Sequence, residues 1–417
     1  MTNMAVNSPA MLRAKRFADR PVLPMLATLF FLATFAIKAF TDGPYVRGEV
    51  SQTVAYSKYV TALLACVFAA LSCIGKKGRT FKREFNNLIA IVVVFSLISA
   101  VMSLASNMFS SNVLIELVKL AMPIVLAYFM LNALDENELY HCMLAVLVIC
   151  LVGYAVDLRS KGVSFSSIFS ANVSEGSSAT ESSSFSDIAL MLTFYFGFFN
   201  KRKLPLFIST GFTVLAFKRL AMLVAILVLL ISLIWPQVKR MRVRKGFITF
   251  LKILTLVFAA IWVWLLLPEQ QNLFYSMFGR LPFDFTMGRS QSLRYLWESG
   301  FQSYGFGSAN DVIKAIYNVP FEMDLAKIAF ELTPVATALF VWLFWNVAGT
   351  SLWGVLIVSY FMLNMITSDA LTSNFAFTIA YMVMGLVNET VQNSTQSEQK
   401  VLTQGRYING RAGINER

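Results

Sequence analysis

Residues 204–235, LPLFISTGFTVLAFKRLAMLVAILVLLISLIW, form a largely apolar stretch with Lys218 and Arg219 at its centre. Basic groups flank it on both sides, at 201–203 and at 239–245. A single helix of this stretch would be about 48 Å long, against roughly 30 Å of bilayer hydrocarbon. It would also place the two basic flanks on opposite sides of the membrane, against the positive-inside rule. We therefore expect two short antiparallel helices that turn at Lys218 and Arg219 and return both flanks to the cytoplasm.

The turn between these helices places two cations at or below the outer interface of the bilayer. A cation costs roughly 2.5–3.5 kcal/mol at mid-membrane on insertion scales, and less near the edge. One interpretation is a tight turn whose long side chains reach outward to water. The other, which we favour, is an anion site that faces the extracytoplasmic side.

The composition of the chain is typical of a polytopic helical membrane protein. It is 57% hydrophobic and only 14% charged, with a mean hydropathy of +0.63. The net charge of +12 does not indicate nucleic-acid binding, because the cations lie between apolar segments and do not form one basic domain. His141 is the only histidine, and the four cysteines lie in or beside apolar stretches without metal-ligand spacing. No disulfide is implied.

Apolar windows predict an all-α protein with about twelve transmembrane helices and one large extracytoplasmic loop. The first apolar stretch lacks a clear cleavage site, so we interpret it as a retained helix. Parity places both termini and the basic loop 75–85 in the cytoplasm, in agreement with its charge and with Arg13, Lys15, Arg16 and Arg20 in the N-terminal tail. The predicted organisation is an N-terminal bundle at 1–267, a loop region at 268–324, C-terminal helices at 325–390 and a cytoplasmic tail at 391–417. The predicted helices are 22–40, 54–74, 87–106, 113–132, 140–157, 185–199, 204–217, 220–235, 247–267, 325–346, 352–368 and 374–390.

Two segments are predicted to lie outside. Residues 158–184 are rich in serine and are interpreted as a flexible connector or, less simply, a binding segment. Residues 268–324 combine aromatic residues with mixed charges and glycines, so we expect them to fold on the membrane surface and carry function. Aromatic faces with interleaved polar groups, such as Tyr295 and Trp297, suit the C–H faces and hydroxyls of sugars.

The large loop contains two arginines that could bind an anion. Arg289 follows Gly288 and has no acid within one helical turn, and a guanidinium suits phosphate oxygens. Arg294 and Glu298 are spaced i,i+4, so they are equally well explained as a local ion pair. The pair Gly305 and Gly307 predicts only a turn.

Downstream, Asp324, Lys327 and Glu331 are spaced i, i+3 and i+7 and therefore share one helical face. One interpretation is an ion cluster in which Lys327 neutralises two carboxylates. The alternative is that one partly desolvated carboxylate acts as a general base or orients a sugar hydroxyl, with Glu322 close enough to substitute. For Asp369, helix capping is the simpler role. The sequence has no G-x-x-x-x-G-K-[ST] motif and no paired-acid pattern for a metal.

Four patches resemble the O-antigen and exopolysaccharide polymerase (Wzy-type) family, which is related to O-antigen ligases. The turn Leu215-Ala216-Phe217-Lys218-Arg219-Leu220-Ala221 is similar to a family turn that places an arginine at the start of a membrane helix. The loop patch Met287-Gly288-Arg289-Ser290 followed by Trp297, the pair of glycines at 305 and 307, and the acidic helix start at 324–331 follow in the same order. Together the four patches cover roughly residues 185–390, and the first half matches only in hydropathy.

The resemblance implies a GT-C-like glycosyltransferase of the bacterial inner membrane. It would polymerise undecaprenyl-diphosphate-linked repeat units at the outer face, without a cofactor and without a metal, because arginines can stabilise the departing diphosphate. The implied diphosphate ligands are Arg219 and Arg289, supported by Lys218 and Arg294, and the implied residues near the incoming hydroxyl are Asp324 or Glu331. Implied partners are the lipid-linked oligosaccharides and membrane lipid, with a chain-length regulator and a flippase as further candidates, and no nucleic acid.

Two other functions stay open. A lipid-linked oligosaccharide flippase or other transporter would also suit twelve helices, although the charges gather on one side and no inverted repeat is evident. A ligase of the same superfamily would carry a histidine near the helix start at 324, where this chain has Glu322-Met323-Asp324. The sequence therefore favours polymerase over ligase.

Overall fold

The structure, a computed structural model, describes residues 22–74, 80–163, 182–199 and 201–412. Several sequence predictions concern residues outside these ranges. They are the N-terminal cations Arg13, Lys15, Arg16 and Arg20, the loop cations Lys76, Lys77 and Arg79, and most of the serine-rich segment.

The described residues form helices and connecting loops, with no strand among them and a single isolated bridge between Arg242 and Ser351. The chain divides into two compact units. The first comprises residues 1–79 and 129–160, and the second comprises residues 80–128 and 161–417. The all-α prediction is confirmed for the described chain. The domain boundaries predicted from the sequence were placed at loops and basic flanks. That division stays a prediction.

In the first unit, α2 (Val22–Val46) packs against both α3 (Gln52–Ser72) and α6 (Glu136–Ser160). Lys38 and Lys58 both bind Asp42, and Arg47 binds Asp157 at 2.8 Å. The only histidine, His141, is exposed near the start of α6 and pairs with the carbonyl oxygen of Asn137. These balanced charges join the three helices of the unit.

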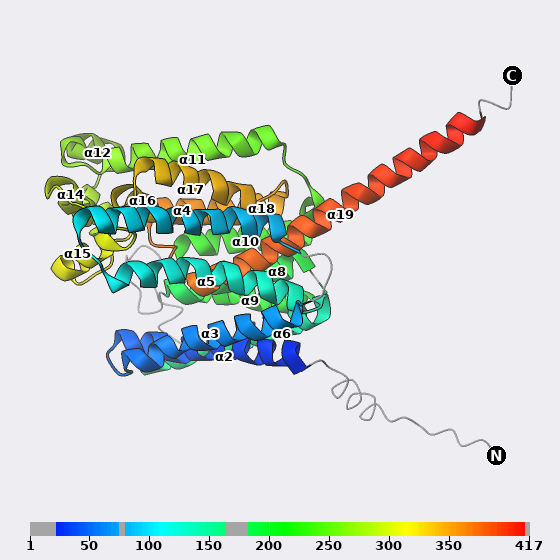
Figure 1. The fold of residues 1–417 in the computed structure, drawn as a ribbon, viewed down its shortest axis with the longest axis horizontal. Coiled ribbons are helices and arrows are strands. Elements are labelled where there is room, and N and C mark those ends of the chain that lie inside the picture. The colour runs from blue at the N-terminus through cyan, green and yellow to red at the C-terminus, as the bar shows by residue number, and fades with distance from the viewer. Residues whose placement is uncertain (1–21, 75–79, 164–181, 200, 413–417) are drawn as a thin grey trace, which may run out of the picture. The chain divides into compact units, whose positions relative to one another are not determined.

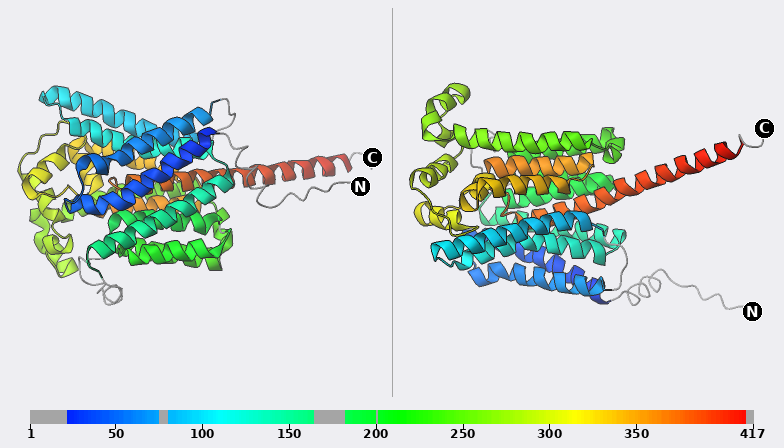
Figure 2. Two further views of the ribbon diagram at one scale, coloured as in Figure 1. Left: turned by 90° about the horizontal axis from the view of Figure 1, so that it is seen from below. Right: turned by 45° about the horizontal axis from the view of Figure 1, so that its top comes forward.

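The second unit consists of a bundle of longer helices and a group of short ones (Figure 1). In Figures 1 and 2, α12, α14 and α15 lie at one end of α4 and α11, and α19 extends beyond the other end. The last residues of α5, from Phe129, are assigned to the first unit. The longer helices are α4 (Lys82–Ser106), α5 (Ser111–Ala133), α8 (Ser183–Phe199), α9 (Lys203–Leu215), α10 (Arg219–Ile234), α11 (Lys245–Leu265), α17 (Pro334–Val347), α18 (Leu352–Thr367) and α19 (Asn374–Ala412). The short helices are η1 (Pro236–Arg240), η2 (Pro268–Gln270), α12 (Gln271–Phe278), α13 (Pro282–Phe285), α14 (Arg289–Glu298), α15 (Ser308–Tyr317) and α16 (Asp324–Glu331).

The core of this unit is built around α8, which packs against α9, α10 and α19. Residues 188–195 of α8 are completely buried, and the Nε1 of Trp353 on α18 donates to the carbonyl oxygen of Phe194 at 3.1 Å. A helix that is apolar on all sides has to be enclosed by other helices or by lipid. In α8 the other helices enclose it.

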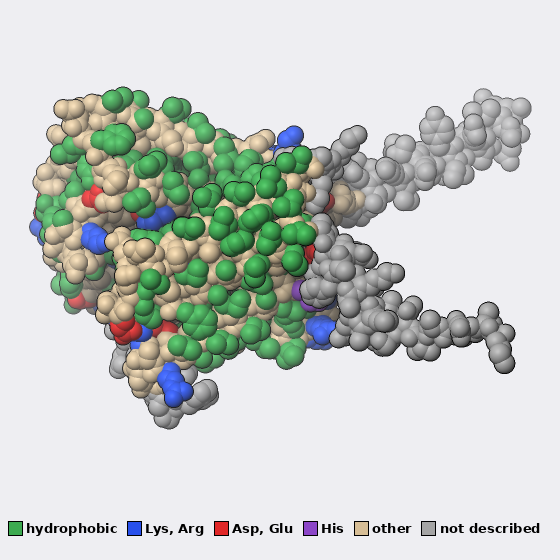
Figure 3. Space-filling view, turned by 60° about the horizontal axis from the view of Figure 1, so that its bottom comes forward, with side chains coloured by type: hydrophobic (Ala, Val, Ile, Leu, Met, Phe, Trp, Pro, Cys, Tyr) green, Lys and Arg blue, Asp and Glu red, His purple; other side chains and the backbone are tan. Residues whose placement is uncertain are grey.

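Within the part of the chain that the structure describes, six helices are long and apolar enough to cross a membrane: α2, α3, α4, α5, α6 and α11. On α11, Lys252, Thr255, Ala259 and Trp262 are buried while Phe250, Ile253, Val257 and Ile261 are exposed, so the helix presents an apolar face outward. Figure 3 shows such hydrophobic side chains along the helices and charged side chains near their ends. Each of the twelve predicted ranges contains a helix, but α8, α9, α10, α17 and α18 are shorter apolar helices. Twelve crossings therefore stay a prediction.

The stretch 204–235 forms two helices, as predicted. α9 ends at Leu215 and α10 begins at Arg219, with Phe217 between them in the left-handed region at φ 59°. The two helices measure about 20 and 24 Å. Neither alone matches roughly 30 Å of hydrocarbon.

The prediction of one continuous helix over 325–346 was wrong. The chain forms α16, ends it at Glu331, and begins α17 at Pro334. Proline has no backbone N–H and disfavours helical geometry in the residue before it. Thr333 instead caps α17, because its hydroxyl accepts the N–H of Ala336 at 3.0 Å.

The segment 268–324 is folded rather than extended as a loop. It contains η2 and the short helices α12, α13, α14 and α15. Its aromatic side chains pack on one another, as Phe274 does with Phe278 and Phe285. The side of the membrane on which it lies stays a prediction.

Candidate functional site

Three of the predicted patches lie beside unusual backbone conformations. Among the described residues, six non-glycine residues have a positive φ, and three of them are Phe217 (59°), Met287 (52°) and Met323 (111°). Phe217 precedes Lys218, Met287 precedes Gly288-Arg289, and Met323 separates Glu322 from Asp324. Left-handed backbone costs on the order of 1–3 kcal/mol in a non-glycine residue and is concentrated at functional sites. The coincidence singles out these three patches.

Arg289 begins α14 and pairs with an acid that is distant in sequence. Its Nε donates to Oε2 of Glu322 in a short hydrogen bond, and the two side chains are 28% and 34% exposed. The pair therefore faces solvent in part and stays accessible to a ligand. The side chain of Thr286 caps the start of α14 by accepting the N–H of Ser290 at 3.0 Å, which fixes the position from which Arg289 projects.

Arg294 forms the local pair that its spacing allowed. Its Nε lies 2.8 Å from Oε1 of Glu298, and both side chains are about half exposed. An exposed pair of this kind contributes little to stability. Tyr295, from the same helix, is half-buried against Tyr317, and Trp297 is exposed and contacts Phe330 edge-on.

The acidic helix α16 buries all three of the charges that the spacing placed on one face. Asp324 and Glu331 are fully buried and Lys327 is 2% exposed. Lys327 lies 3.6 Å from Glu116 on α5 and above the ring of Phe306 at 5.2 Å. Glu116 also binds Lys119 at 2.8 Å. Lys327 therefore pairs with Glu116, an acid that the sequence analysis did not name, and neutralisation of Asp324 and Glu331 by Lys327 stays a prediction.

Glu331 binds backbone groups at the start of α15. Its Oε2 accepts the N–H of Gly307 at 2.7 Å, and its Oε1 accepts the N–H of Ala309 at 2.9 Å. The first N–H groups of a helix have no partner within the helix, so a buried carboxylate there acts as a cap. Both oxygens of Glu331 are thus engaged in holding α15.

The segment from Tyr304 to Gly307 inserts between α4 and α5. A Cβ on Gly305 would lie 3.0 Å from the Cβ of Ser99, and one on Gly307 would lie 2.9 Å from Cγ of Glu116. Both glycines also have positive φ, so this segment is more than the simple turn that the sequence indicated. Burial, with a hydrogen bond to Asp311, raises the pKa of Tyr304 above its usual value.

Asp324 binds the loop between α18 and α19. Its Oδ2 accepts the N–H groups of Ala370 at 2.6 Å and Leu371 at 2.8 Å. Its Oδ1 is buried and meets no hydrogen-bond donor, but the carboxyl group of Asp369 interacts with Asp324 electrostatically and is close enough to share a hydrogen bond with it when one of the two acids is protonated. Asp369 itself accepts the N–H of Thr372, so it caps the loop rather than a helix. The unpartnered Oδ1 is the most chemically notable atom of α16.

Lys218, at the turn between α9 and α10, is paired inside the protein. Its Nζ lies 3.0 Å from Oδ1 of Asp187, a fully buried acid of α8 that the sequence analysis missed. Arg219, the first residue of α10, is exposed. Because Ser373 also donates to Asp187, at 2.9 Å, the turn is joined to the same loop that Asp324 holds.

The loop 368–373 therefore brings the predicted patches together. On one side it contacts α16, where the carbonyl oxygen of Ser368 accepts the N–H groups of Met323 and Asp324. On its other side it reaches Asp187 and, through it, Lys218. A lone acid in an apolar helix is a functional signal in its own right, and this signal could have identified Asp187 in the predicted helix 185–199.

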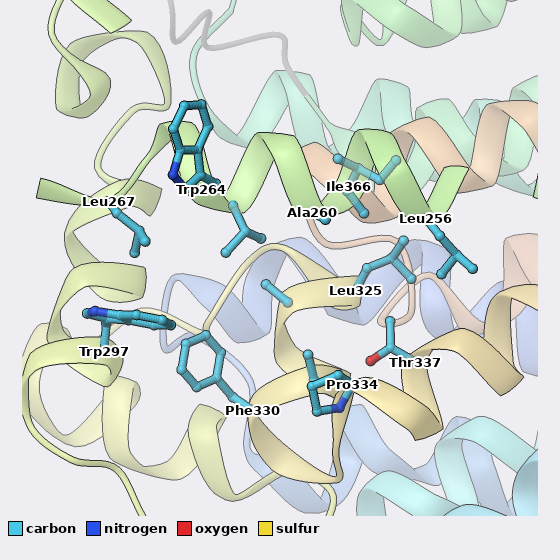
Figure 4. A pocket seen from close by; sticks show the side chains of 14 residues that line it. Leu256, Ala260, Trp264, Leu267, Trp297, Leu325, Phe330, Pro334, Thr337 and Ile366 are labelled. Carbon is cyan, nitrogen blue, oxygen red and sulfur yellow. The ribbon is translucent and has the colours of Figure 1, made fainter. Parts of the chain in front are cut away.

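An apolar groove of about 410 Å³ lies beside this cluster (Figure 4). Its walls come from α11, α16 and α17, and Trp297 and Phe330 lie together at one end. A second hollow of about 430 Å³ shares Leu267 with the groove and carries polar groups from Ser290, Gln291 and Arg294. An apolar groove next to a hollow that carries some polar groups can accommodate a molecule with an apolar tail and a polar head.

No family model matches the chain, and no curated protein or solved structure shows detectable similarity to it. The assignment of a function therefore depends on the arrangement of its own residues.

Proposed function

We propose that this protein polymerises undecaprenyl-diphosphate-linked oligosaccharide repeat units at the outer face of a bacterial inner membrane. The observation that carries the proposal is the convergence on one loop, 368–373, of the cationic turn at Lys218-Arg219 and the acidic helix start at Asp324. Arg289 is paired with Glu322, which lies two residues before Asp324 in the sequence. The product would be O-antigen, capsular or exopolysaccharide.

The groove and the polar hollow suit a lipid-linked sugar. The prenyl tail would lie in the apolar groove against α11 and α17, and the sugars would lie toward Trp297 and Tyr295. Aromatic faces stack on the C–H faces of sugars, and the adjacent hollow supplies hydroxyl, amide and guanidinium groups. The tail would thus direct the diphosphate toward the cationic residues.

In the proposed reaction, a hydroxyl oxygen of the incoming repeat unit attacks the anomeric carbon of the glycan on the other carrier. The bond from that carbon to the diphosphate oxygen breaks, and the electron pair leaves with undecaprenyl diphosphate. The hydroxyl proton passes to a carboxylate. Arg219 and Arg289 would stabilise the charge on the leaving diphosphate, which is an electrostatic role for preorganised donors.

The hydrogen bonding of the three carboxylates supports a choice among them for the proton transfer. Glu331 has both oxygens on backbone N–H groups, whereas Asp324 has an unpartnered Oδ1 and Glu322 is 34% exposed. We therefore favour Asp324, with Glu322 as the alternative, over Glu331. Lys218 would support the turn from its pair with Asp187 rather than contact the diphosphate.

The test is polymer formation by the purified protein in liposomes that contain a lipid-diphosphate-linked repeat unit. Arg219→Ala and Arg289→Ala should each reduce the rate on the order of a thousandfold, as expected for loss of one charge-stabilising donor. Arg280→Ala is the matched control, because Arg280 is an exposed arginine of the same segment that lines neither the groove nor the hollow. Polymerisation that is unaffected by both alanine variants would contradict the assignment. A deletion strain that accumulates single repeats inside would indicate a flippase instead.

A further inference from the structure

Asp187 accepts hydrogen bonds from three side chains that lie outside its own helix. Its two oxygens accept from Lys218 Nζ at 3.0 and 3.1 Å, from the Tyr360 hydroxyl and from the Ser373 hydroxyl at 2.9 Å. These partners belong to three separate segments: the α9–α10 turn, α18, and the loop that precedes α19. A fully buried carboxylate on α8 thus joins three segments at one point.

Asp187 and Asp324 hold the same loop from two sides. Asp324 binds the backbone N–H groups of Ala370 and Leu371, and Asp187 binds the side chain of Ser373. The loop connects α18 to α19 across only a few residues, so displacement of one anchor moves the other. The cationic turn is tied to this assembly by Lys218 and by the N–H of Ser182, which donates to the carbonyl oxygen of Ala216 at 3.1 Å.

A buried ion pair is a poor device for stability alone, because apolar residues of similar volume usually stabilise a core at least as well. Its value is in fixing geometry. Here the fixed element is a turn with left-handed backbone at Phe217, followed directly by the exposed Arg219. Lys218 is paired with Asp187, and Arg219, the next residue, is exposed.

We propose that Asp187 is a positioning residue: it holds the Lys218-Arg219 turn and the loop 368–373 in register, so that Arg219 meets an anionic diphosphate beside Asp324. This inference rests on the proposed function for the identity of the anion. It assigns Lys218 to the clamp and Arg219 to the ligand.

The clamp is tested first without any turnover, by hydrogen exchange of the purified full chain followed by mass spectrometry. Asp187→Asn keeps the shape of the side chain but leaves the buried cation of Lys218 without its counter-charge. Exchange should rise about tenfold or more in both 216–221 and 368–373, while α2 and α3 stay unchanged. The double variant Asp187→Asn with Lys218→Met removes both charges and should restore most of the protection. Unchanged exchange in Asp187→Asn would overturn the clamp.

The ligand side is tested by binding of farnesyl diphosphate, a short lipid diphosphate, and by the KM and kcat of polymerisation. Asp187→Asn should weaken binding and raise KM about tenfold with a smaller effect on kcat, and the double variant should recover both. Arg219→Ala should abolish binding without altering exchange at 368–373, which separates ligand from clamp. A double variant that recovers protection but not binding would place Lys218 on the ligand and overturn the assignment.

The two proposals fail in different ways. Wild-type protein that binds farnesyl diphosphate in an Asp187-dependent manner but makes no polymer would refute polymerisation and leave the clamp standing. If the wild-type protein makes polymer and Asp187→Asn changes neither hydrogen exchange nor KM, the clamp alone is refuted. If Asp187→Asn does not fold, Ser373→Ala and the double variant carry the same comparison. Ser276→Ala is the serine control, because the Ser276 hydroxyl donates to the carbonyl oxygen of Leu273 in its own helix, outside the network. Ser373→Ala should raise exchange mainly in 368–373.

Discussion

Replacement of Glu331 distinguishes a capping role from a catalytic one. The carboxylate accepts two buried backbone N–H groups, from Gly307 and Ala309. A hydrogen bond to a charged acceptor contributes about 1.5–3 kcal/mol, so Glu331→Ala should destabilise the protein by about 3–6 kcal/mol. Glu331→Gln keeps one accepting oxygen but turns an N–H₂ group toward the second donor, and should cost roughly half as much.

The measurement is thermal unfolding in one detergent, with polymer formation followed in parallel. Thermal stability should fall in the order wild type, glutamine variant, alanine variant, and amide exchange at Gly307 and Ala309 should rise in the same order. The matched control is Glu298→Ala, an exposed acid whose pair with Arg294 should contribute no more than about 1 kcal/mol. Activity should follow stability in all three variants.

One result would refute this reasoning. If Glu331→Gln unfolds like the wild type but makes no polymer, then the carboxylate is used in chemistry and the two N–H bonds do not define its role. An alanine variant that is both stable and active would refute the capping energy itself.

Three further predictions test the geometry. Gly307→Ala should lower stability by about 2 kcal/mol more than Gly300→Ala, because both glycines have positive φ but only at Gly307 would the new Cβ meet Glu116, at 2.9 Å; equal thermal shifts would contradict the close approach. Asp324→Asn should abolish polymer while the protein stays folded, since one oxygen can still accept from Ala370 and Leu371; recovery in Asp324→Asn with Lys327→Met would show a purely structural pair. Gln302→Cys should react with an impermeant thiol reagent in intact spheroplasts, and protection would overturn the outward placement of 268–324.

Local sequence pattern predicted the positions of the helices well, because apolar runs and their basic flanks are local signals. It also placed Asp324, Lys327 and Glu331 on one face of a helix, and all three are buried together. It failed at Thr333-Pro334, where the sequence remains largely hydrophobic but the helix is interrupted. The proline was the available signal, and the apolar window outweighed it.

The partners of these residues could not be predicted, because they are distant in sequence or belong to the backbone. Arg289 pairs with Glu322, thirty-three residues on, and Lys218 pairs with Asp187 thirty-one residues back. Spacing identifies which side chains share a helical face but not what the face meets. Asp324 and Glu331 bind backbone N–H groups, which every residue except proline carries, so no residue type marks their partners.

The same physics explains why the charges of this chain converge where its helices break. Breaks at 216–218, 332–333 and 368–373 release backbone groups that cannot stay unpaired in an apolar surrounding. A buried carboxylate meets the need at one of these breaks, where Asp324 binds residues 370 and 371, and Glu331 does the same at the start of α15. Most acids in the cluster are therefore committed to holding the chain. The capacity that remains, at Asp324 Oδ1 and at the half-exposed pair of Glu322 and Arg289, is where a substrate hydroxyl and a diphosphate would find partners.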